Sequence, residues 1–234
     1  MRYYVIMNGV NSLTIQGLAI RELPPISKPL MRNIREEIDG RNGDIITELG
    51  YSAYDKELEI GLYGESYDIN DIIAFFNGKG TITFSDEPDK YYYYQILNQI
   101  DYEKLLKFKT ASVVFHCQPF KYKVNEAPIT LSVGDNTINN LGNTYAKPTI
   151  TIVGSDTVTI SLDGNQIFSI DMSTHGKIVL DTANLEAYDP DNGQLLNRIV
   201  TGDYDSFKIN SGANTLSLSG NITTATIINY QRWL

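Results

Sequence analysis

Residues 110–118 constrain the fold more than any other part of the chain, because their apolar side chains recur at every second position. A period of two places alternate side chains on one face of a β-strand. The apolar positions are Ala111, Val113, Phe115 and Cys117. The pattern therefore predicts a strand with one face turned toward a core.

A short amphipathic helix is predicted over residues 69–76. Asp68 can cap its start by accepting a hydrogen bond from the backbone N–H of Asp71, and Gly78 can supply the left-handed residue that ends it. Its apolar stripe consists of Ile69, Ile72, Ile73 and Phe76. Because isolated helices of fewer than ~12 residues are marginal in water, this helix must pack on a sheet.

The rest of the first half reads as strands and turns. Asn42-Gly43 is a strong hairpin signal, because both residues tolerate positive φ. Strands are expected at 3–8, 13–23, 31–38, 45–49, 56–62, 80–84 and 91–100, with an acidic turn at 85–89. A sheet with one short helix is an α+β domain.

Composition changes near residues 121–128. Residues 1–122 hold 12 Tyr and 5 Thr with a net charge of −4, whereas residues 123–234 hold 4 Tyr and 14 Thr with a net charge of −5. We therefore expect two domains, 1–122 and 123–234.

The second domain is expected to be an antiparallel β-sandwich, because short strands alternate with Gly, Asn and Asp clusters. Asp163-Gly164 predicts a tight hairpin, and residues 193–198 could form a helical turn. Strands are expected around 131–133 and at 149–153, 158–162, 167–172, 177–181, 205–209, 215–219 and 224–232.

The charge and cysteine content exclude several classes of protein. The net charge is −9, and no basic run suits a nucleic acid. The single Cys117 excludes an intrachain disulfide and reads as a small buried apolar residue. No stretch resembles a signal peptide or a membrane span, so we expect synthesis and assembly in a cytoplasm.

No group of residues predicts catalysis, a metal or a cofactor. The carboxylates of Asp86, Glu87 and Asp89 lie in a Pro-containing turn, which is typical of a solvated hairpin end. Residues 189–193 (DPDNG) resemble the start of a calcium loop, but Val200 stands where a bidentate Glu should close it. His116 and Cys117 are adjacent on a strand and therefore point to opposite faces.

Residues 91–94 form a run of four tyrosines, which puts two rings on each face of a strand. Such a strand is either buried between two layers or presents one face to a partner. The partner could be a protein or a sugar that stacks on the rings.

Several motifs in combination resemble the N-terminal domain of distal tail proteins of siphophages that infect Gram-positive bacteria. They are Asn8-Gly9, 38–44 (IDGRNGD), 75–80 (FFNGKG), 84–92 (FSDEPDKYY) and 115–122 (FHCQPFKY). The second half is similar to the smaller galectin-like C-terminal sandwich of that family. Its motifs are Gly142-Asn143, Lys147-Pro148 and 229–234 (NYQRWL).

The resemblance implies a structural protein of the virion, located at the distal end of the tail and not an enzyme. It implies a six-fold ring of N-terminal domains that continues the tail tube, with the sandwiches pointing outward. It also implies contacts to the tail tube protein, the tail tip or tail-associated lysin, and baseplate or receptor-binding proteins.

A head-to-tail ring needs two complementary patches on each subunit. We expect Arg32, Arg35 and Arg41 to face Asp or Glu of a neighbour. The other candidate interface residues are Asn42, Gly43, Asp44, Tyr91 and Tyr92. One alternative is a carbohydrate-binding module that uses exposed tyrosines or Trp233. Another is a tail-associated hydrolase, for which we can place no carboxylate pair.

Overall fold

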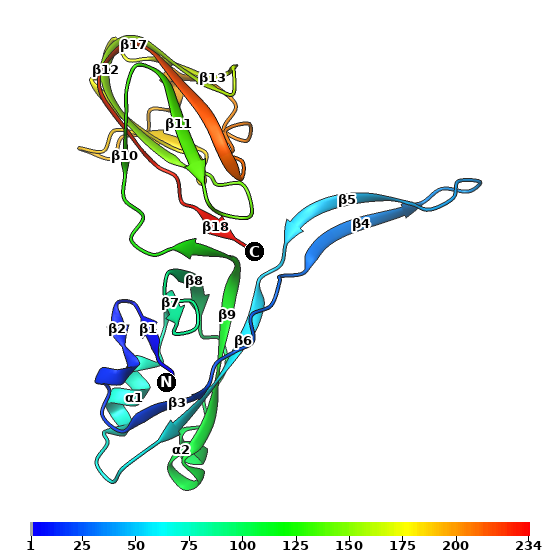
Figure 1. Cartoon of the computed structure of the whole chain (residues 1–234), viewed down its shortest axis with the longest axis vertical. Helices are drawn as coiled ribbons and strands as arrows, with labels where there is room; N and C mark the ends of the chain where they lie inside the picture. The colour runs from blue at the N-terminus through cyan, green and yellow to red at the C-terminus, as the bar shows by residue number, and fades with distance from the viewer. Residues whose placement is uncertain (1) are drawn as a thin grey trace. The chain divides into compact units, whose positions relative to one another are not determined.

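The computed structural model describes residues 2–234, which form two compact units (Figure 1). The first unit ends at Val124 and also takes in Leu234, and the second covers Asn125–Trp233. Each unit has its own cluster of buried apolar side chains. The fold is mainly β, as predicted.

One antiparallel sheet forms the body of the first unit, with strand order β2-β1-β7-β8-β9-β6-β3. Its strands are β1 (Val5–Met7), β2 (Val10–Asn11), β3 (Leu18–Glu22), β6 (Tyr54–Leu62), β7 (Lys79–Phe84), β8 (Lys90–Gln95) and β9 (Thr110–Lys123). A 3-10 turn, Ser12–Thr14, lies between β2 and β3.

Strand β9 buries the face that its alternation predicts. Ala111, Val113, Phe115 and Cys117 are all buried. The ring of Phe115 is fully buried, and its centroid lies 5.3 Å from that of Tyr94 and 6.4 Å from those of Phe76 and Phe84. These ring contacts, edge-on with Tyr94 and Phe84 and tilted with Phe76, join β7, β8, β9 and the end of the first helix into one core.

Helix α1 (Ile69–Phe75) confirms the predicted helix. Asp68 caps it, although its carboxylate accepts from Asn70 N at 2.8 Å and not from Asp71. Gly78 has φ +76°, the left-handed conformation that ends the helical segment.

A second helix, α2 (Tyr102–Phe108), corrects the expectation of a single helix. Asp101 caps it by accepting from Lys104 N at 2.8 Å, and Leu105 is fully buried. The strand expected to reach residue 100 therefore ends at Gln95. Residues 96–100 are apolar enough to resemble a strand, but they lead into this helix.

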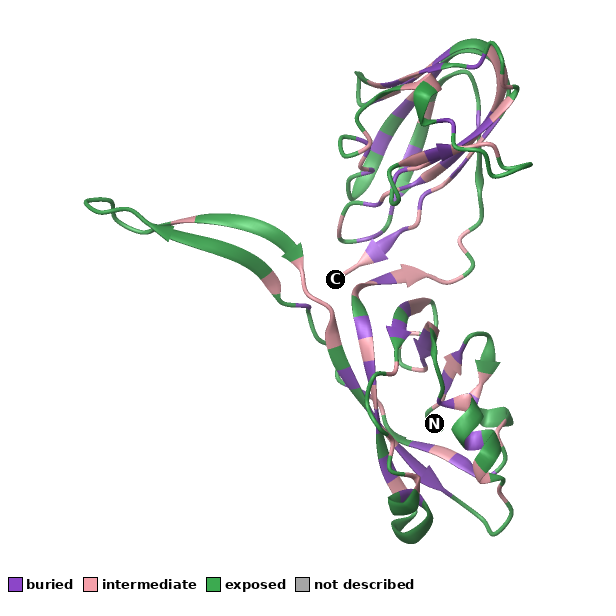
Figure 2. Ribbon diagram, turned by 180° about the vertical axis from the view of Figure 1, so that it is seen from behind, coloured by how far each residue is buried: buried purple, intermediate pink, exposed green. Residues whose placement is uncertain are grey.

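A two-stranded hairpin leaves the sheet of the first unit, and we call residues 31–51 the arm. Strand β4 (Met31–Glu37) pairs only with β5 (Asp44–Tyr51), which confirms the hairpin predicted around Asn42-Gly43. Figure 2 shows that its length is almost entirely exposed.

The second unit contains a single network of antiparallel strands, ordered β10-β17-β12-β13-β16, with β11 on β17 and β14 between β12 and β15. Their bounds are β10 (Ile129–Leu131), β11 (Gly134–Asn140), β12 (Thr149–Leu162), β13 (Asn165–Asp171), β14 (Lys177–Asp181), β15 (Glu186–Tyr188), β16 (Val200–Gly202) and β17 (Gly212–Ile228). The short strand β18 is Arg232–Trp233.

Strands β12 and β17 are long because each one serves both halves of this network. Residues 149–153 of β12 pair with β14 and with the end of β17, whereas residues 157–162 pair with β13 and with the start of β17. The register shifts between Val153 and Gly154, and again between Ser155 and Thr159. These bulges bend both strands, so each predicted pair of short strands is one bent strand.

Two smaller expectations in this unit are corrected. Residues 205–209 form no strand, and only an isolated bridge joins Ile209 to Ala146. Asp203 holds this segment in a turn, because its carboxylate accepts from Asp205 N and Ser206 Oγ. The predicted helical turn is a short 3-10 helix, Asn197–Ile199.

Candidate assembly surface

The arm exposes apolar side chains along its whole length. Ile34 lies opposite Thr47, and Ile46 lies opposite Arg35. Ile46 is 58% exposed, and Ile34, Ile38 and Leu49 are each 48% exposed. A lone two-stranded hairpin is marginally stable in water. Burial of these apolar side chains against another surface would therefore stabilise the arm.

The arginines of the arm contact only the arm in the hydrogen bonds that they make. Arg32 Nη2 donates to Leu49 O at 3.1 Å, and Arg35 Nε donates to Asn33 Oδ1 at 3.3 Å. Neither acceptor is a carboxylate. Both guanidinium groups therefore keep donors that can pair with an acidic group of another molecule.

The tip of the arm contains the remaining residues predicted there. Gly40 and Gly43 have φ of +80° and +77°, so the turn depends on glycine at these positions. Asp44 lies directly opposite Glu37. Like charges directly opposite on a hairpin are destabilising, and a nearby cation would relieve this repulsion. The structure thus gathers Arg32, Arg35, Arg41, Asn42, Gly43 and Asp44 on one element.

The tyrosines of β8 alternate between the two faces, as predicted. Tyr92 is only 3% exposed and its ring packs against Phe84, with the centroids 5.9 Å apart. Tyr91 lies on the other face, where its ring stacks on that of Tyr122 at 5.6 Å and meets that of Tyr93 at 5.4 Å. Tyr92 is therefore a core residue with no face to offer a partner.

The acidic turn between β7 and β8 is not simply a solvated hairpin end. The carboxylate of Glu87 accepts from Lys121 Nζ at 3.0 Å and from Lys90 Nζ at 3.2 Å, and its side chain is only 17% exposed. Sequence reasoning missed this ion pair, because Lys121 lies 34 residues away on β9. Glu87 ties the turn to β9.

Residues 189–193, whose sequence resembles the start of a calcium-binding loop, form a hydrogen-bonded turn. Asp189 accepts from Asp191 N at 2.9 Å and from Asn192 Nδ2 at 3.0 Å. Within residues 2–234 no group of three or more His, Cys, Asp or Glu side chains could hold a metal ion.

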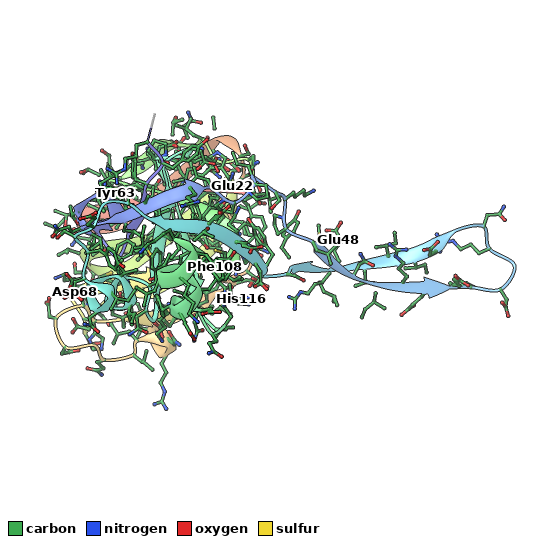
Figure 3. All side chains as sticks on the ribbon, turned by 90° about the horizontal axis from the view of Figure 1, so that it is seen from below. Glu22, Glu48, Tyr63, Asp68, Phe108 and His116 are labelled. Atoms are coloured by element: carbon green, nitrogen blue, oxygen red, sulfur yellow. The ribbon has the colours of Figure 1, made fainter. Side chains whose placement is uncertain are left out.

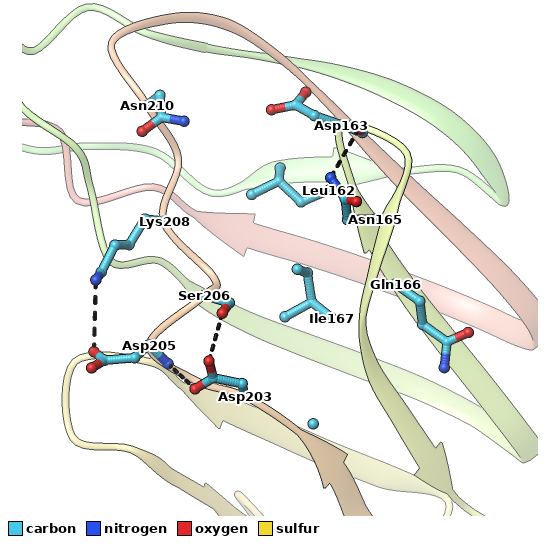
Figure 4. Close-up of a pocket in the computed structure, with 11 residues that line it drawn as sticks. Leu162, Asp163, Asn165, Gln166, Ile167, Asp203, Asp205, Ser206, Lys208 and Asn210 are labelled. Atoms are coloured by element: carbon cyan, nitrogen blue, oxygen red, sulfur yellow. Dashed lines mark hydrogen bonds and ion pairs between the residues drawn. The ribbon is translucent and has the colours of Figure 1, made fainter.

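A polar hollow of about 860 Å³ lies on the second unit (Figure 4). Its carboxylates have partners inside the protein: Asp163 accepts from Thr215 N at 2.8 Å, and Asp205 accepts from Lys147 Nζ at 3.3 Å. Among the described residues that line it, none is aromatic. A sugar ring would therefore find no stacking surface in this hollow.

In the described part of the chain, no helix is long and apolar enough to cross a membrane.

Comparison with protein families gives a match within the first unit. Residues 15–117 match the model of the phage tail protein RIFT-related domain. We call these residues, which match a phage tail domain, the tail domain. The match runs from Ile15, directly after the 3-10 turn, to Cys117 on β9, so the arm is part of the tail domain.

Solved structures extend the likeness to the whole chain. The crystal structure of Dit from phage SPP1 matches with 18% sequence identity, 100% of both chains covered and a TM-score of 0.74. SPP1 Dit is described as a paradigm of the hub adsorption apparatus in phages that infect Gram-positive bacteria. The chain therefore has the fold of SPP1 Dit, with the tail domain as its first half.

A second match is a chain of the phage P2 baseplate in its activated conformation with Ca. It has 12% identity, covers 97% of this chain and 96% of that chain, and has a TM-score of 0.50. No curated protein sequence matches this chain.

Proposed function

We propose that this protein is the structural hub at the distal end of a phage tail, where six copies form a ring that links the tail tube to the tail tip. The single observation that carries this proposal is the full-length likeness to SPP1 Dit. The tail domain at residues 15–117 supports the same location in the virion.

In this proposal, residues 1–122 form the ring, and residues 123–234 form a galectin-like sandwich that points outward. The partners are further copies of the chain, the tail tube protein, the tail-associated lysin or tip, and baseplate or receptor-binding proteins. Neither an enzymatic nor a nucleic-acid-binding role is part of it.

The arm is the part of the tail domain best suited to join neighbouring copies. From residue 31 to residue 41 it spans ten residues, which at 3.3 Å each is a reach of about 33 Å. A head-to-tail contact joins two different patches, and an arm with a receiving surface provides such a pair. Six copies at −9 each carry −54. Arg32, Arg35 and Arg41 are therefore proposed to meet carboxylates of the neighbour.

Light scattering across a range of protein concentrations tests the proposal. Six copies of a 26.2 kDa chain weigh about 157 kDa. We expect this mass for the wild type alone at high concentration, or binding of six copies to each end-site of purified tail tubes. A strictly monomeric mass under both conditions would contradict the proposal.

A matched pair of variants locates the contact. Ile46→Asn alters an arm side chain that is 58% exposed, and Val133→Asn alters a side chain of the second unit that is 57% exposed. We expect Ile46→Asn to weaken ring formation at least ~10-fold, because it replaces apolar surface that the neighbour buries, while Val133→Asn has no effect. Equal effects of the two variants would exclude the arm as the contact.

A further inference from the structure

The segment that leads into the arm, residues 23–30 (LPPISKPL), cannot be held by an ordinary strand ladder. Pro24, Pro25 and Pro29 have no backbone N–H. The register of β3 on β6 ends where Glu22 faces Glu59. Beyond Glu22, contacts other than strand pairing have to hold residues 23–30 in position.

Two side chains of β6 provide the missing hydrogen bonds. Lys56 Nζ donates to Pro25 O at 3.0 Å, and Tyr54 Oη donates to Ser27 O at 3.4 Å. One backbone hydrogen bond, which Ser52 N donates to Leu30 O at 2.9 Å, then joins the two segments that enter and leave the arm at its base. The three contacts follow one another toward β4 and β5.

The surroundings of Lys56 indicate that it has this specific role. The residue is only 4% exposed, and its Nζ lies 4.9 Å from the ring centroid of Tyr92, 5.3 Å from that of Tyr54 and 5.8 Å from that of Phe84. Burial lowers the pKa of Lys56. An apolar side chain of similar length would avoid this loss of hydration. A lysine adds a cation that faces these three rings and a donor that reaches Pro25 O, and only the donor contacts the leading segment.

We propose that Lys56 is a positioning residue that sets the direction of the arm. Because the prolines stiffen the leading segment, fixing the carbonyl of Pro25 fixes the segment that β4 continues. The proposal rests on the proposed function, in which the arm must meet a neighbouring copy. An arm held in one direction loses less conformational freedom when it docks.

The test measures the arm directly in the monomer. Spin labels are attached at Arg41→Cys on the tip and at Glu103→Cys on α2, and the distance distribution between them is recorded by pulsed electron paramagnetic resonance. The native Cys117 does not interfere, because it is fully buried and burial raises its pKa to about 12. The variant is Lys56→Met, and the control is Lys79→Met, which removes an exposed lysine from β7.

We expect a narrow distribution for the wild type and for Lys79→Met. The distribution should widen about twofold in Lys56→Met, because an untethered segment samples more conformations. The thermal unfolding of the label-free variants is measured in parallel. A folded Lys56→Met protein with a distribution as narrow as the wild type's would overturn the proposal, whether or not rings form.

Ring formation by the wild type, Lys56→Met and Lys79→Met without the labelling sites, so that Arg41 is intact, separates this inference from the proposed function. A wider distribution together with weakened assembly supports both. A wider distribution in a protein whose wild type never forms rings supports the tether and contradicts the ring. If Lys56→Met unfolds, Tyr54→Phe replaces it, because this change removes only the hydroxyl that donates to Ser27 O.

Discussion

At the scale of single residues, the carboxylate of Glu87 holds the turn between β7 and β8 against β9. Its partner Lys121 has a side chain that is only 7% exposed. Loss of the carboxylate charge would leave a buried ammonium group without its anion, which is the most damaging way to break an ion pair.

We therefore expect Glu87→Gln to lower the free energy of unfolding of the first unit by about 2–4 kcal/mol. Glu103→Gln is the matched control, because Glu103 pairs with Lys107 at 2.6 Å on an exposed helix face and should contribute about 0.5 kcal/mol or less. Urea denaturation followed by near-UV circular dichroism measures both variants. Similar losses in the two would show that Glu87 is no more than a surface partner.

A second residue-scale prediction concerns alkaline pH. Burial raises the pKa of Cys117 from 9.0 to about 12. Between these values the unfolded chain loses the thiol proton and the folded chain keeps it, so the free energy of unfolding falls as pH rises. The slope approaches about 1.4 kcal/mol per pH unit within that window.

Cys117→Ala should remove this part of the slope. Tyrosines whose pKa is raised by burial and not by Cys117, such as Tyr94 and Tyr102, add a fall of the same sign in both proteins and cancel in the comparison. Urea midpoints measured from pH 8 to pH 10 test the prediction. Parallel curves for the wild type and Cys117→Ala would contradict it.

At the scale of elements, the arm differs from the sheet of the first unit because almost all of its residues are exposed, although at its base the ring of Tyr51 contacts that of Phe120, with the centroids 5.8 Å apart. Figure 3 shows the arm extending outward, with side chains, among them Glu48, standing out from its ribbon. An element with few buried contacts opens at low free energy.

Hydrogen exchange should therefore separate the arm from the sheet. In the monomer, amides of β4 and β5 are expected to exchange at least ~100-fold faster than those of β6 and β9. In an assembled sample, the arm amides should become protected, because a neighbour covers them. Arm protection that is unchanged by assembly would mean that the arm is not part of the contact.

Some strands and turns could be predicted from local sequence patterns alone. The apolar alternation was sufficient to predict strand β9, and the Asn42-Gly43 turn was sufficient to predict the hairpin of the arm. Helix α2 was missed because its seven residues bury only Leu105 fully, which leaves almost no apolar period. Its one usable signal is the Asp101 cap followed by the Glu103 and Lys107 pair.

Contacts between distant parts of the chain could not be predicted from local patterns. Glu87 meets Lys121 only because the sheet places β9 beside the turn between β7 and β8. In the same way, Lys56 reaches Pro25 only because β6 lies beside the segment that follows β3. Six of the candidate interface residues fall in one hairpin, which the Asn42-Gly43 turn predicted, and their role in a contact stays a prediction. Tyr92 is buried in the core of the unit, which could not be predicted because a run of four tyrosines does not reveal which face is buried.

At the scale of the whole molecule, the fold separates a tail domain that carries an arm from a second unit with its own core. The family match over residues 15–117 and the likeness to SPP1 Dit are the basis of the proposed assembly. An exposed apolar hairpin on a chain of net charge −9 is consistent with a surface that is completed by another copy.

Electron cryomicroscopy of the purified full chain, across the concentrations used for light scattering and with tail tubes present, is the most direct test of the proposed ring. We expect closed six-fold rings with a central opening, in which the arm of each subunit lies on the next. Isolated monomers at every concentration and with tail tubes present, or rings whose arms touch no neighbour, would contradict it.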